Sequence, residues 1–405
     1  MKQILFQQGK AKFSVVPDVV VSNGRILVEV THSFISAGTE MSTVSNESGN
    51  FWIRALKQPQ AVFAALKMVK ERGIQKTWMM VEGVRNQEKP MGYSCAGRVL
   101  TVGNGVNDIF VGDRVACGGA ADAHHAELVS VPRNLVVKVP EGLSLEQASC
   151  ATIGSIAMQG FRRADVRLGD RVAVIGLGLL GQLTLQLLRA SGCHVLGSDP
   201  DEKRRERAKL FGAEMVINPA EQNAVNRARD FGNGHGVDAT IITAASKLPG
   251  IIQQTMEMTR RKGRVILVGA VPIEFDRSPF YQKEIDFLIS CSYGPGRYDP
   301  EYEQKGLDYP YAYVRWTENR NMQEFLELAA RGSLDISGVI DKVFPAQEVE
   351  KAYNTLKSEG EKPLGVVLEF PVSQMPVSDS LSRISQTKIE LATSSSAKEG
   401  KLNLA

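Results

Sequence analysis

The stretch that decides the fold runs from Arg171 to Asp199 and reads RVAVIGLGLLGQLTLQLLRASGCHVLGSD. A β-branched strand leads into the turn Gly176-Leu177-Gly178-Leu179-Leu180-Gly181, and an apolar-periodic helix follows the turn. The first glycine permits a tight turn, the second lets the backbone approach a pyrophosphate, and the third lets the helix pack on the strand. Free N–H groups at the start of that helix attract phosphate. The stretch therefore predicts a dinucleotide-binding site.

The residue after the second strand indicates which dinucleotide is bound. Strand 194–198 ends at Asp199, whose carboxylate can accept both hydroxyls of the adenosine ribose and would repel a 2′-phosphate. We therefore expect NAD(H) rather than NADP(H). Arg204 and Arg205 follow closely enough to contact a 2′-phosphate, although solvated charges on the next helix are the simpler interpretation.

Strand and helix patterns alternate from Arg171 onward, which is typical of a doubly wound α/β fold. They predict a six-stranded parallel sheet with strands at 172–175, 194–198, 215–218, 238–243, 264–269 and 285–290, and with helices at 201–211, 220–230 and 249–261. Such a sheet binds its ligand at the carboxyl ends of its strands. Ala244, Gly269 and Val271 should therefore line the cofactor site together with the glycine turn.

The rest of the chain has a different pattern. Short Val-rich strands separated by Gly, Asn and Asp turns fill the first 150 residues and predict an antiparallel, partly closed β domain. Strand 365–370 returns to this character. We expect a β-rich catalytic domain at 1–150 and 333–370, a nucleotide-binding domain at 151–332, and a polar tail at 371–405 that is disordered or a linker. A helix at about 51–73 forms either core packing or a lid or subunit contact.

Composition narrows the class of protein. The chain has 405 residues, a net charge of +3 and 23% charged residues, which is typical of a two-domain globular protein and indicates neither nucleic-acid nor membrane binding. The first ten residues lack the apolar stretch of a secretion signal, so we expect a cytoplasmic protein. Five cysteines without a CxxC pair indicate buried free thiols. We expect a homo-oligomer, most simply a dimer.

Several motifs resemble those of the medium-chain dehydrogenase/reductases. These motifs are Ser-Ala-Gly-Thr-Glu at 36–40, Gly-Tyr-Ser-Cys-Ala-Gly at 92–97, Val-Gly-Asp-Arg-Val at 111–115, and the glycine turn. The resemblance implies a GroES-like catalytic domain, a Rossmann domain, and hydride transfer with a nicotinamide cofactor.

Four further motifs, at 278–281, 294–300, 306–310 and 314–318, are similar to the N-terminal half of bacterial bi-domain oxidoreductases. In those proteins a Gfo/Idh/MocA-like module follows, and they are commonly associated with the synthesis of surface polysaccharides and sugar derivatives. The polar tail begins where their interdomain linker begins. A separate oxidoreductase chain is therefore a candidate partner.

The resemblance to the zinc-containing members breaks down at the metal ligands. Those members have Cys-Gly-Thr-Asp in the first motif and Gly-His-Glu in the second, whereas Ala37, Tyr93 and Ser94 occupy the ligand positions here. Alanine and serine do not bind Zn²⁺ as those ligands do, and a neutral tyrosine is a poor substitute for imidazole. We therefore expect no zinc.

Without zinc, a side chain must stabilise or protonate the reacting oxygen. Tyr93 is the first candidate because it occupies a former ligand position, with a packed core tyrosine as the alternative. Glu40 could act as a base or orient a substrate hydroxyl, or it could cap or pair with an arginine. Thr39 and Ser36 could hydrogen-bond the nicotinamide ribose or the substrate.

A Gly- and Pro-rich loop supplies further polar and aromatic candidates, namely Tyr293, Arg297 and Tyr298. Arginine on such a loop suits a substrate phosphate or carboxylate, whereas the alternative is a loop that only packs. His124 and His125 are adjacent, so at most one of them could face the site.

The leading hypothesis is a zinc-independent, NAD(H)-dependent oxidoreductase that acts on an alcohol or carbonyl of a polar, sugar-like metabolite. A reductase of activated C=C bonds and a non-catalytic partner of a separate oxidoreductase are the alternatives.

Overall fold

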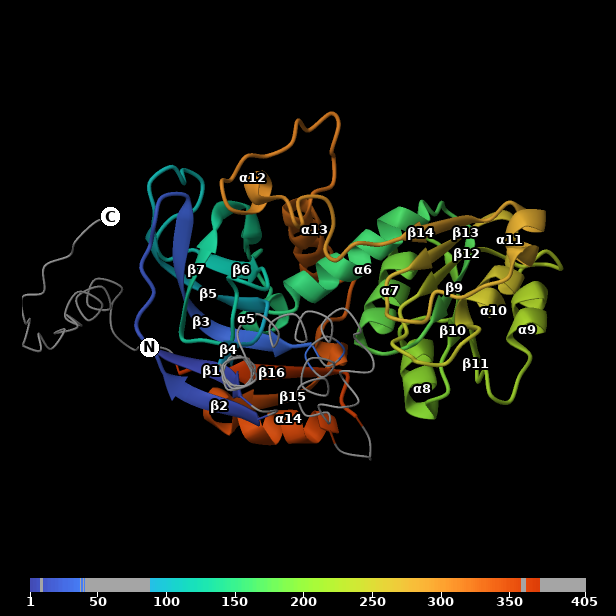
Figure 1. Ribbon diagram of the computed structural model, residues 1–405, viewed down its shortest axis with the longest axis horizontal. Coiled ribbons are helices and arrows are strands. Elements are labelled where there is room, and N and C mark those ends of the chain that lie inside the picture. Colours follow the sequence, from blue (N-terminus) through green and yellow to red (C-terminus); the bar gives the residue numbers. More distant parts are fainter. Residues whose placement is uncertain (8–9, 37, 39, 41–87, 358–361, 372–405) are drawn as a thin grey trace, which may run out of the picture. The chain divides into compact units, whose positions relative to one another are not determined.

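The computed structural model describes residues 1–7, 10–36, 38, 40, 88–357 and 362–371, and Met1–Val372 form one compact unit (Figure 1). Ala37, Thr39, the expected helix at 51–73 and the tail beyond residue 371 lie outside the described residues. Among the helices that are described, none is long and apolar enough to cross a bilayer.

The predicted six-stranded parallel sheet is confirmed, in the order β11-β10-β9-β12-β13-β14. Its strands are β9 (Arg171–Ile175), β10 (His194–Ser198), β11 (Met215–Ile217), β12 (Val237–Ile242), β13 (Thr259–Leu267) and β14 (Asp286–Ile289). The strand order reverses between β9 and β12, and a sheet of this kind binds its ligand at the carboxyl ends of the strands beside that reversal. The glycine turn follows β9, and Ala244 lies just beyond β12.

The helices that connect these strands are α7 (Leu179–Ala190), α8 (Glu202–Leu210), α9 (Ala224–Phe231), α10 (Ile251–Met258) and α11 (Arg277–Lys283). The helices predicted after β9, β10, β11 and β12 are present with shifted boundaries, α9 beginning at Ala224 rather than at residue 220, and α11 was not predicted. Helix α10 ends at Met258, not at residue 261, and β13 begins directly at Thr259. The Thr259 hydroxyl donates to the carbonyl of Thr255 at 2.7 Å and lies 2.9 Å from the Thr240 hydroxyl on β12. These contacts hold a β-branched residue in the extended conformation it favours.

The second large sheet has the path β15-β16-β3-β5-β6-β8, and β7 pairs with β3. Its strands are β3 (Arg25–Ile35), β5 (Ser94–Val102), β6 (Arg114–Gly118), β7 (Leu128–Pro132), β8 (Val136–Lys138), β15 (Ile340–Pro345) and β16 (Gly365–Glu369). Strand β16 runs antiparallel to β3 and pairs Val366 with Ile35. The prediction that the C-terminal strand closes against the first part of the chain is thus confirmed.

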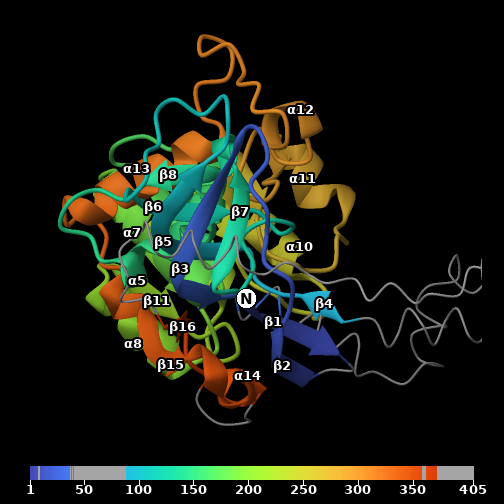
Figure 2. The ribbon, with the colours of Figure 1, turned by 90° about the vertical axis from the view of Figure 1, so that its left-hand side faces the viewer.

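A smaller sheet in the order β2-β1-β4 is formed by β1 (Lys2–Gln7), β2 (Lys10–Val15) and β4 (Lys89–Pro90). Helix α14 (Val349–Lys357) contacts β2, and Figure 2 shows this helix beside the small sheet. Tyr353 of α14 packs edge-on against Phe6 of β1, with 5.4 Å between the ring centroids. The C-terminal segment therefore packs on the N-terminal strands as well as on β3.

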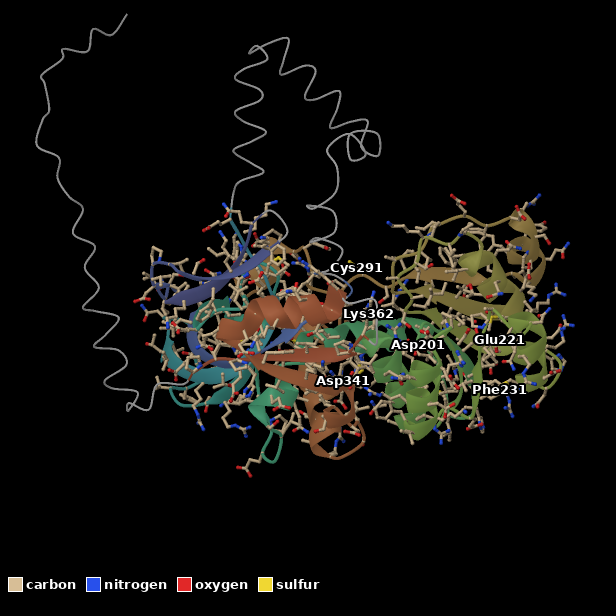
Figure 3. The ribbon with its side chains drawn as sticks, turned by 90° about the horizontal axis from the view of Figure 1, so that it is seen from below. Asp201, Glu221, Phe231, Cys291, Asp341 and Lys362 are labelled. Carbon is tan, nitrogen blue, oxygen red and sulfur yellow. The ribbon has the colours of Figure 1, made fainter. Side chains whose placement is uncertain are left out.

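Helix α6 (Ala151–Ala164) contacts β5 and β6 of one large sheet and β12 and β13 of the other, and it packs on α13 (Glu318–Ala330). Gly154 makes this helix pair close, because a Cβ there would lie 2.3 Å from the Phe325 ring. A second link is the ion pair at 2.6 Å between Arg207 of α8 and Asp341 of β15; Asp341 is labelled in Figure 3. Two short helices, α5 (Leu145–Ala148) and α12 (Pro300–Glu303), complete the α-helices of the described residues.

Candidate active site

The three glycines of the turn 176–181 have different surroundings. Gly176 has φ +95°, and a Cβ there would lie 2.7 Å from the backbone of Ala244. A Cβ at Gly181 would lie 1.9 Å from the carbonyl oxygen of Gly176. At Gly178, by contrast, the nearest atom to such a Cβ is an Arg204 nitrogen at 4.0 Å. Two glycines are thus required by close packing, and the third faces open space in front of the turn.

The first turn of α7 faces the same space. The helix begins at Leu179, so the N–H groups of Leu179 and Leu180 belong to the first turn, where a helix has no backbone acceptors for them. Backbone donors at a helix N-terminus bind phosphate oxygens well.

Asp199 lies against this turn. Its Oδ2 accepts a hydrogen bond from the backbone N–H of Leu177 at 2.7 Å, and its Oδ1 accepts one from that of Asp201 at 2.9 Å. A guanidinium nitrogen of Arg204 lies 3.8 Å from Oδ2. Arg205 instead donates to the backbone carbonyl of Asp199 at 2.8 Å. Of the two arginines, Arg204 lies beside the turn and Arg205 holds the backbone.

The opposite side of the site is formed by the ends of β12 and β13. The N–H of Ala270 donates to the carbonyl of Ala244 at 3.0 Å, and a Cβ at Gly269 would lie 2.1 Å from that same carbonyl. Val271 packs on the apolar cluster around Ile242. The structure thus brings Ala244 and Gly269 together at the carboxyl edge of the sheet.

Tyr93 and Ser94 have different surroundings, although they are neighbours. Ser94 is fully buried, and its hydroxyl donates to the carbonyl of Ser149 at 2.6 Å and accepts from the N–H of Thr152 at 3.2 Å. The serine therefore binds the backbone at the beginning of α6. Tyr93 is 8% exposed and packs in the apolar cluster that includes Phe34.

Glu40 is the centre of a buried polar network. Its carboxylate accepts from the N–H of Ser36 at 2.9 Å and from the Tyr353 hydroxyl, and it lies 3.2 Å from Nε2 of His125. Nδ1 of His125 lies 2.6 Å from the Ser33 hydroxyl. Burial, followed by the charge of Glu40, raises the pKa of Tyr353 well above its usual range. The partners of Glu40 are thus a histidine and a tyrosine, not the arginine considered from sequence.

Sequence reasoning missed the partners in this network. His125 is 85 residues and Tyr353 is 313 residues from Glu40, so no local pattern connects them. Of the adjacent histidines, His125 is fully buried and His124 is partly exposed, which agrees with the expectation that they face different environments.

The loop after β14 brings Tyr293, Arg297 and Tyr298 together. The Arg297 guanidinium lies 4.1 Å from the Tyr298 ring centroid and 5.3 Å from that of Tyr293. Arg297 also forms an ion pair with Glu303 at 2.7 Å. This partner neutralises the arginine, which makes it less suited to an anionic substrate group than its sequence position indicated. Tyr293 is buried, whereas Tyr298 is 70% exposed.

Glu318 lies in the same cluster and was not predicted. It is fully buried, and neither carboxylate oxygen has a hydrogen-bond partner; Tyr293 Oη and Arg297 Nε also lack one. Burial and the nearby Glu303 raise the pKa of Glu318 to about 9, although Arg297 opposes the shift. The Thr317-Glu318 pair reads in sequence as an ordinary helix N-terminus, which gives no indication of burial.

Among the residues with described positions, no three His, Cys, Asp or Glu side chains form a group that could hold a metal ion. Cys95, Cys117, Cys150 and Cys193 are buried free thiols, and Cys291, just beyond β14, is exposed. All five are free thiols as expected, but the expectation that they are buried is wrong for Cys291.

Comparison with known proteins adds sequence and structural relatives. Residues 180–305 match the family model described as zinc-binding dehydrogenase. The D-guloside 3-dehydrogenase of Escherichia coli (strain K12) is 28% identical over 278 residues, which cover 67% of this chain and 74% of the relative. The sorbitol dehydrogenase of Bacillus subtilis (strain 168) is 28% identical over 258 residues, covering 55% and 70% respectively.

Solved structures share the fold. Alcohol dehydrogenase TADH from Thermus sp. ATN1 superposes with a TM-score of 0.70 at 20% identity, covering 92% of this chain and 100% of that one. Galactitol-1-phosphate dehydrogenase from Escherichia coli has a TM-score of 0.70 at 16% identity, covering 91% and 100%. The predicted combination of a β-rich sheet and a six-stranded Rossmann sheet is thereby confirmed.

Proposed function

We propose that this chain, which is similar in fold and sequence to medium-chain dehydrogenases of the alcohol-dehydrogenase-like type, transfers hydride between NAD(H) and a polar, sugar-derived alcohol or carbonyl without zinc. The observation that carries the proposal is the open glycine turn with Asp199 hydrogen-bonded at its side. Dehydrogenase relatives named for a guloside and for sorbitol support a polyhydroxylated substrate.

The residues present fit a nicotinamide dinucleotide. The turn 176–181 and the first N–H groups of α7 would hold the pyrophosphate, and Asp199 would accept the ribose hydroxyls. The bound cofactor supplies the hydride donor or acceptor. Asp199 opposes a 2′-phosphate, which supports NAD(H), while Arg204 beside it is the residue that would favour NADP(H).

The residues present do not fit a catalytic zinc ion. Position 37 is an alanine, and the Ser94 hydroxyl is bonded to backbone groups of Ser149 and Thr152. The sequence 41–87 contains neither cysteine nor histidine. Zinc sites are built mainly from those two residue types, so we propose that the reaction proceeds without zinc.

Side chains must then handle the proton. We propose that Tyr93 donates a hydrogen bond or proton to the substrate oxygen, because a phenol can do both. Ser36 and Thr39 would contact the substrate or the nicotinamide ribose. Glu40 would hold the turn 36–40 rather than act as a base, since both of its oxygens are already bonded within the protein.

The test is turnover of glycosides, polyols and their keto forms with NAD(H) or NADP(H), followed at the nicotinamide absorbance band, with metal content measured on the same protein. We expect NAD(H)-dependent turnover that survives strong chelators. Tyr93→Phe should lower kcat by about 10²-fold or more, the usual size of an acid–base contribution, and leave NADH affinity unchanged.

Tyr281→Phe, at an exposed tyrosine on α11, is the matched control and should behave as wild type. Stoichiometric zinc with inactivation by chelators would refute zinc independence. Reduction of enones but not of sugar carbonyls would refute the proposed substrate class.

A further inference from the structure

We propose that His125 is a positioning residue that links two segments of the candidate active site, 36–40 and 91–94, through Glu40. This inference rests on the proposed function, because these segments carry Ser36, Thr39 and Tyr93. The link consists of protein groups alone.

His125 is attached to the second segment through both its backbone and its ring. Its N–H donates to the carbonyl of Met91 at 2.8 Å. The ring packs against Gly92, where φ is +95° and a Cβ would lie 2.7 Å from ring atoms. Only glycine allows this approach, and Tyr93 is the next residue. A shift of the ring would therefore move the backbone that carries Tyr93.

The same ring is attached to the first segment through Glu40. Nε2 lies 3.2 Å from Oε2 of the Glu40 carboxyl group, within hydrogen-bond distance. Glu40 in turn accepts from the N–H of Ser36 at 2.9 Å, which ties Glu40 to the residue that follows β3. Nδ1 lies 2.6 Å from the Ser33 hydroxyl on β3. Both ring nitrogens are thus bonded, and the ring has one orientation.

Burial makes this link strong. His125 is 0% exposed and Glu40 is 3% exposed, so water does not compete for their hydrogen bonds. The Tyr353 hydroxyl donates to the Glu40 oxygen that also lies near Nε2 of His125, which fixes the carboxylate from α14.

The link matters because it joins the two positions that a metal would otherwise hold. Ala37 and Tyr93 occupy the ligand positions of the zinc-containing members, and neither fits a metal here. The His125–Glu40 contact connects the segments on which those two residues lie. Misplacement of reacting groups by about 1 Å can reduce the rate by about 10²-fold. A rigid protein link at this point therefore has a catalytic consequence even though His125 does not touch the substrate.

The test compares His125→Phe with wild type by amide hydrogen exchange and by kinetics. Phenylalanine keeps a ring against Gly92 and removes both ring hydrogen bonds. We expect faster exchange in the peptides that cover 36–40 and 91–94 together, and kcat lowered by about 10-fold to 100-fold. NADH affinity should not change, because the glycine turn is untouched. His194→Gln, at a partly exposed histidine on β10, is the control and should change neither segment.

Two further variants keep the inference testable if His125→Phe does not fold. His125→Gln keeps a side-chain donor towards Glu40, and we expect it to restore part of the protection and of kcat. Tyr353→Phe removes one donor to Glu40 without touching Gly92, so exchange should increase at 36–40 and not at 91–94.

Unchanged exchange at 36–40 in both His125 variants would overturn the inference. Unchanged kcat in a folded His125→Phe would overturn it as well. Because the exchange measurement does not depend on turnover, absence of dehydrogenase activity in the wild type would refute the proposed function and leave the link to be judged by exchange.

Discussion

Glu40 and Glu318 are both buried carboxyl groups, but their partners differ. Glu40 is bonded to Ser36, His125 and Tyr353, whereas neither oxygen of Glu318 has a hydrogen-bond partner. A buried carboxylate without hydrogen bonds is strongly disfavoured, so the neutral acid is the favoured form of Glu318. The pKa of about 9 for Glu318 reflects this difference.

The raised pKa of Glu318 predicts that the free energy of unfolding falls as the pH rises. Its pKa rises from 4.5 to about 9 on folding, so between these values the folded state holds a proton that the unfolded state has lost. The stability that Glu318 contributes is fully present below 4.5 and is lost as the pH rises towards 9. Urea-unfolding midpoints should therefore fall more steeply with pH for wild type than for Glu318→Gln. Glu301→Gln, at an exposed site, should follow wild type. Parallel curves for wild type and Glu318→Gln would contradict this expectation.

We predict that Asp199 sets the preference for NADH over NADPH. A hydrogen bond to a charged group contributes about 1.5–3 kcal/mol, so Asp199→Ser should weaken NADH binding by about 10-fold to 100-fold. The affinity for NADPH should rise relative to that for NADH, because Arg204 lies 3.8 Å from the carboxylate that is removed. Fluorescence titration of both cofactors measures this ratio. Glu206→Gln on α8 is the control, and an unchanged ratio in Asp199→Ser would argue against a ribose-binding role.

At the scale of elements, we expect two glycines of the β9-turn-α7 unit to have different tasks. Gly181 allows the helix to pack on the strand, and Gly178 leaves room for the cofactor. Gly181→Ala places a Cβ 1.9 Å from the Gly176 carbonyl and must push α7 away from β9, at a cost of about 1–3 kcal/mol. It should lower both Tm and NADH affinity. Gly178→Ala places its Cβ in open space and should keep Tm while it obstructs the pyrophosphate. Calorimetry of both variants tests the distinction, and equal losses of Tm would contradict it.

The same unit explains which parts of the fold could be predicted from sequence. Strands β9 and β10 follow from hydrophobic runs bounded by glycine and aspartate, because such signals are local. The change from α10 to β13 at Thr259 could not be predicted, because it depends on a contact with Thr240 on a neighbouring strand.

The candidate site shows the same limit. The cofactor half is a contiguous motif, so the glycine turn and Asp199 could be placed in advance. The pairing of Arg297 with Glu303 and of Glu40 with His125 depends on tertiary packing. The sequence indicated that Arg297 could bind a substrate anion. It did not indicate that Glu303, six residues away, would be its partner.

At the scale of the molecule, α6 contacts both large sheets and packs on α13, where Gly154 lies against the Phe325 ring. Gly154→Val would insert atoms into the Phe325 ring and should destabilise the protein by about 1–3 kcal/mol or more. Scanning calorimetry should show a lower Tm. Arg163→Ala, at an exposed position on the same helix, is the control. A wild-type Tm for Gly154→Val would contradict the expected cost of crowding the contact between α6 and α13.

Strand β3 can pair with β16 only late in synthesis of the chain. Strand β16 pairs with β3 across more than three hundred residues, so the ribosome completes the whole nucleotide-binding region before β3 receives this neighbour. At about 5–20 residues per second, residues 32–35 of β3 wait tens of seconds for this neighbour, whereas β7 can pair with residues 25–29 much earlier. An unpaired strand edge is a template for aggregation. A nascent chain stalled before residue 365 should therefore depend on chaperones far more than the released protein does.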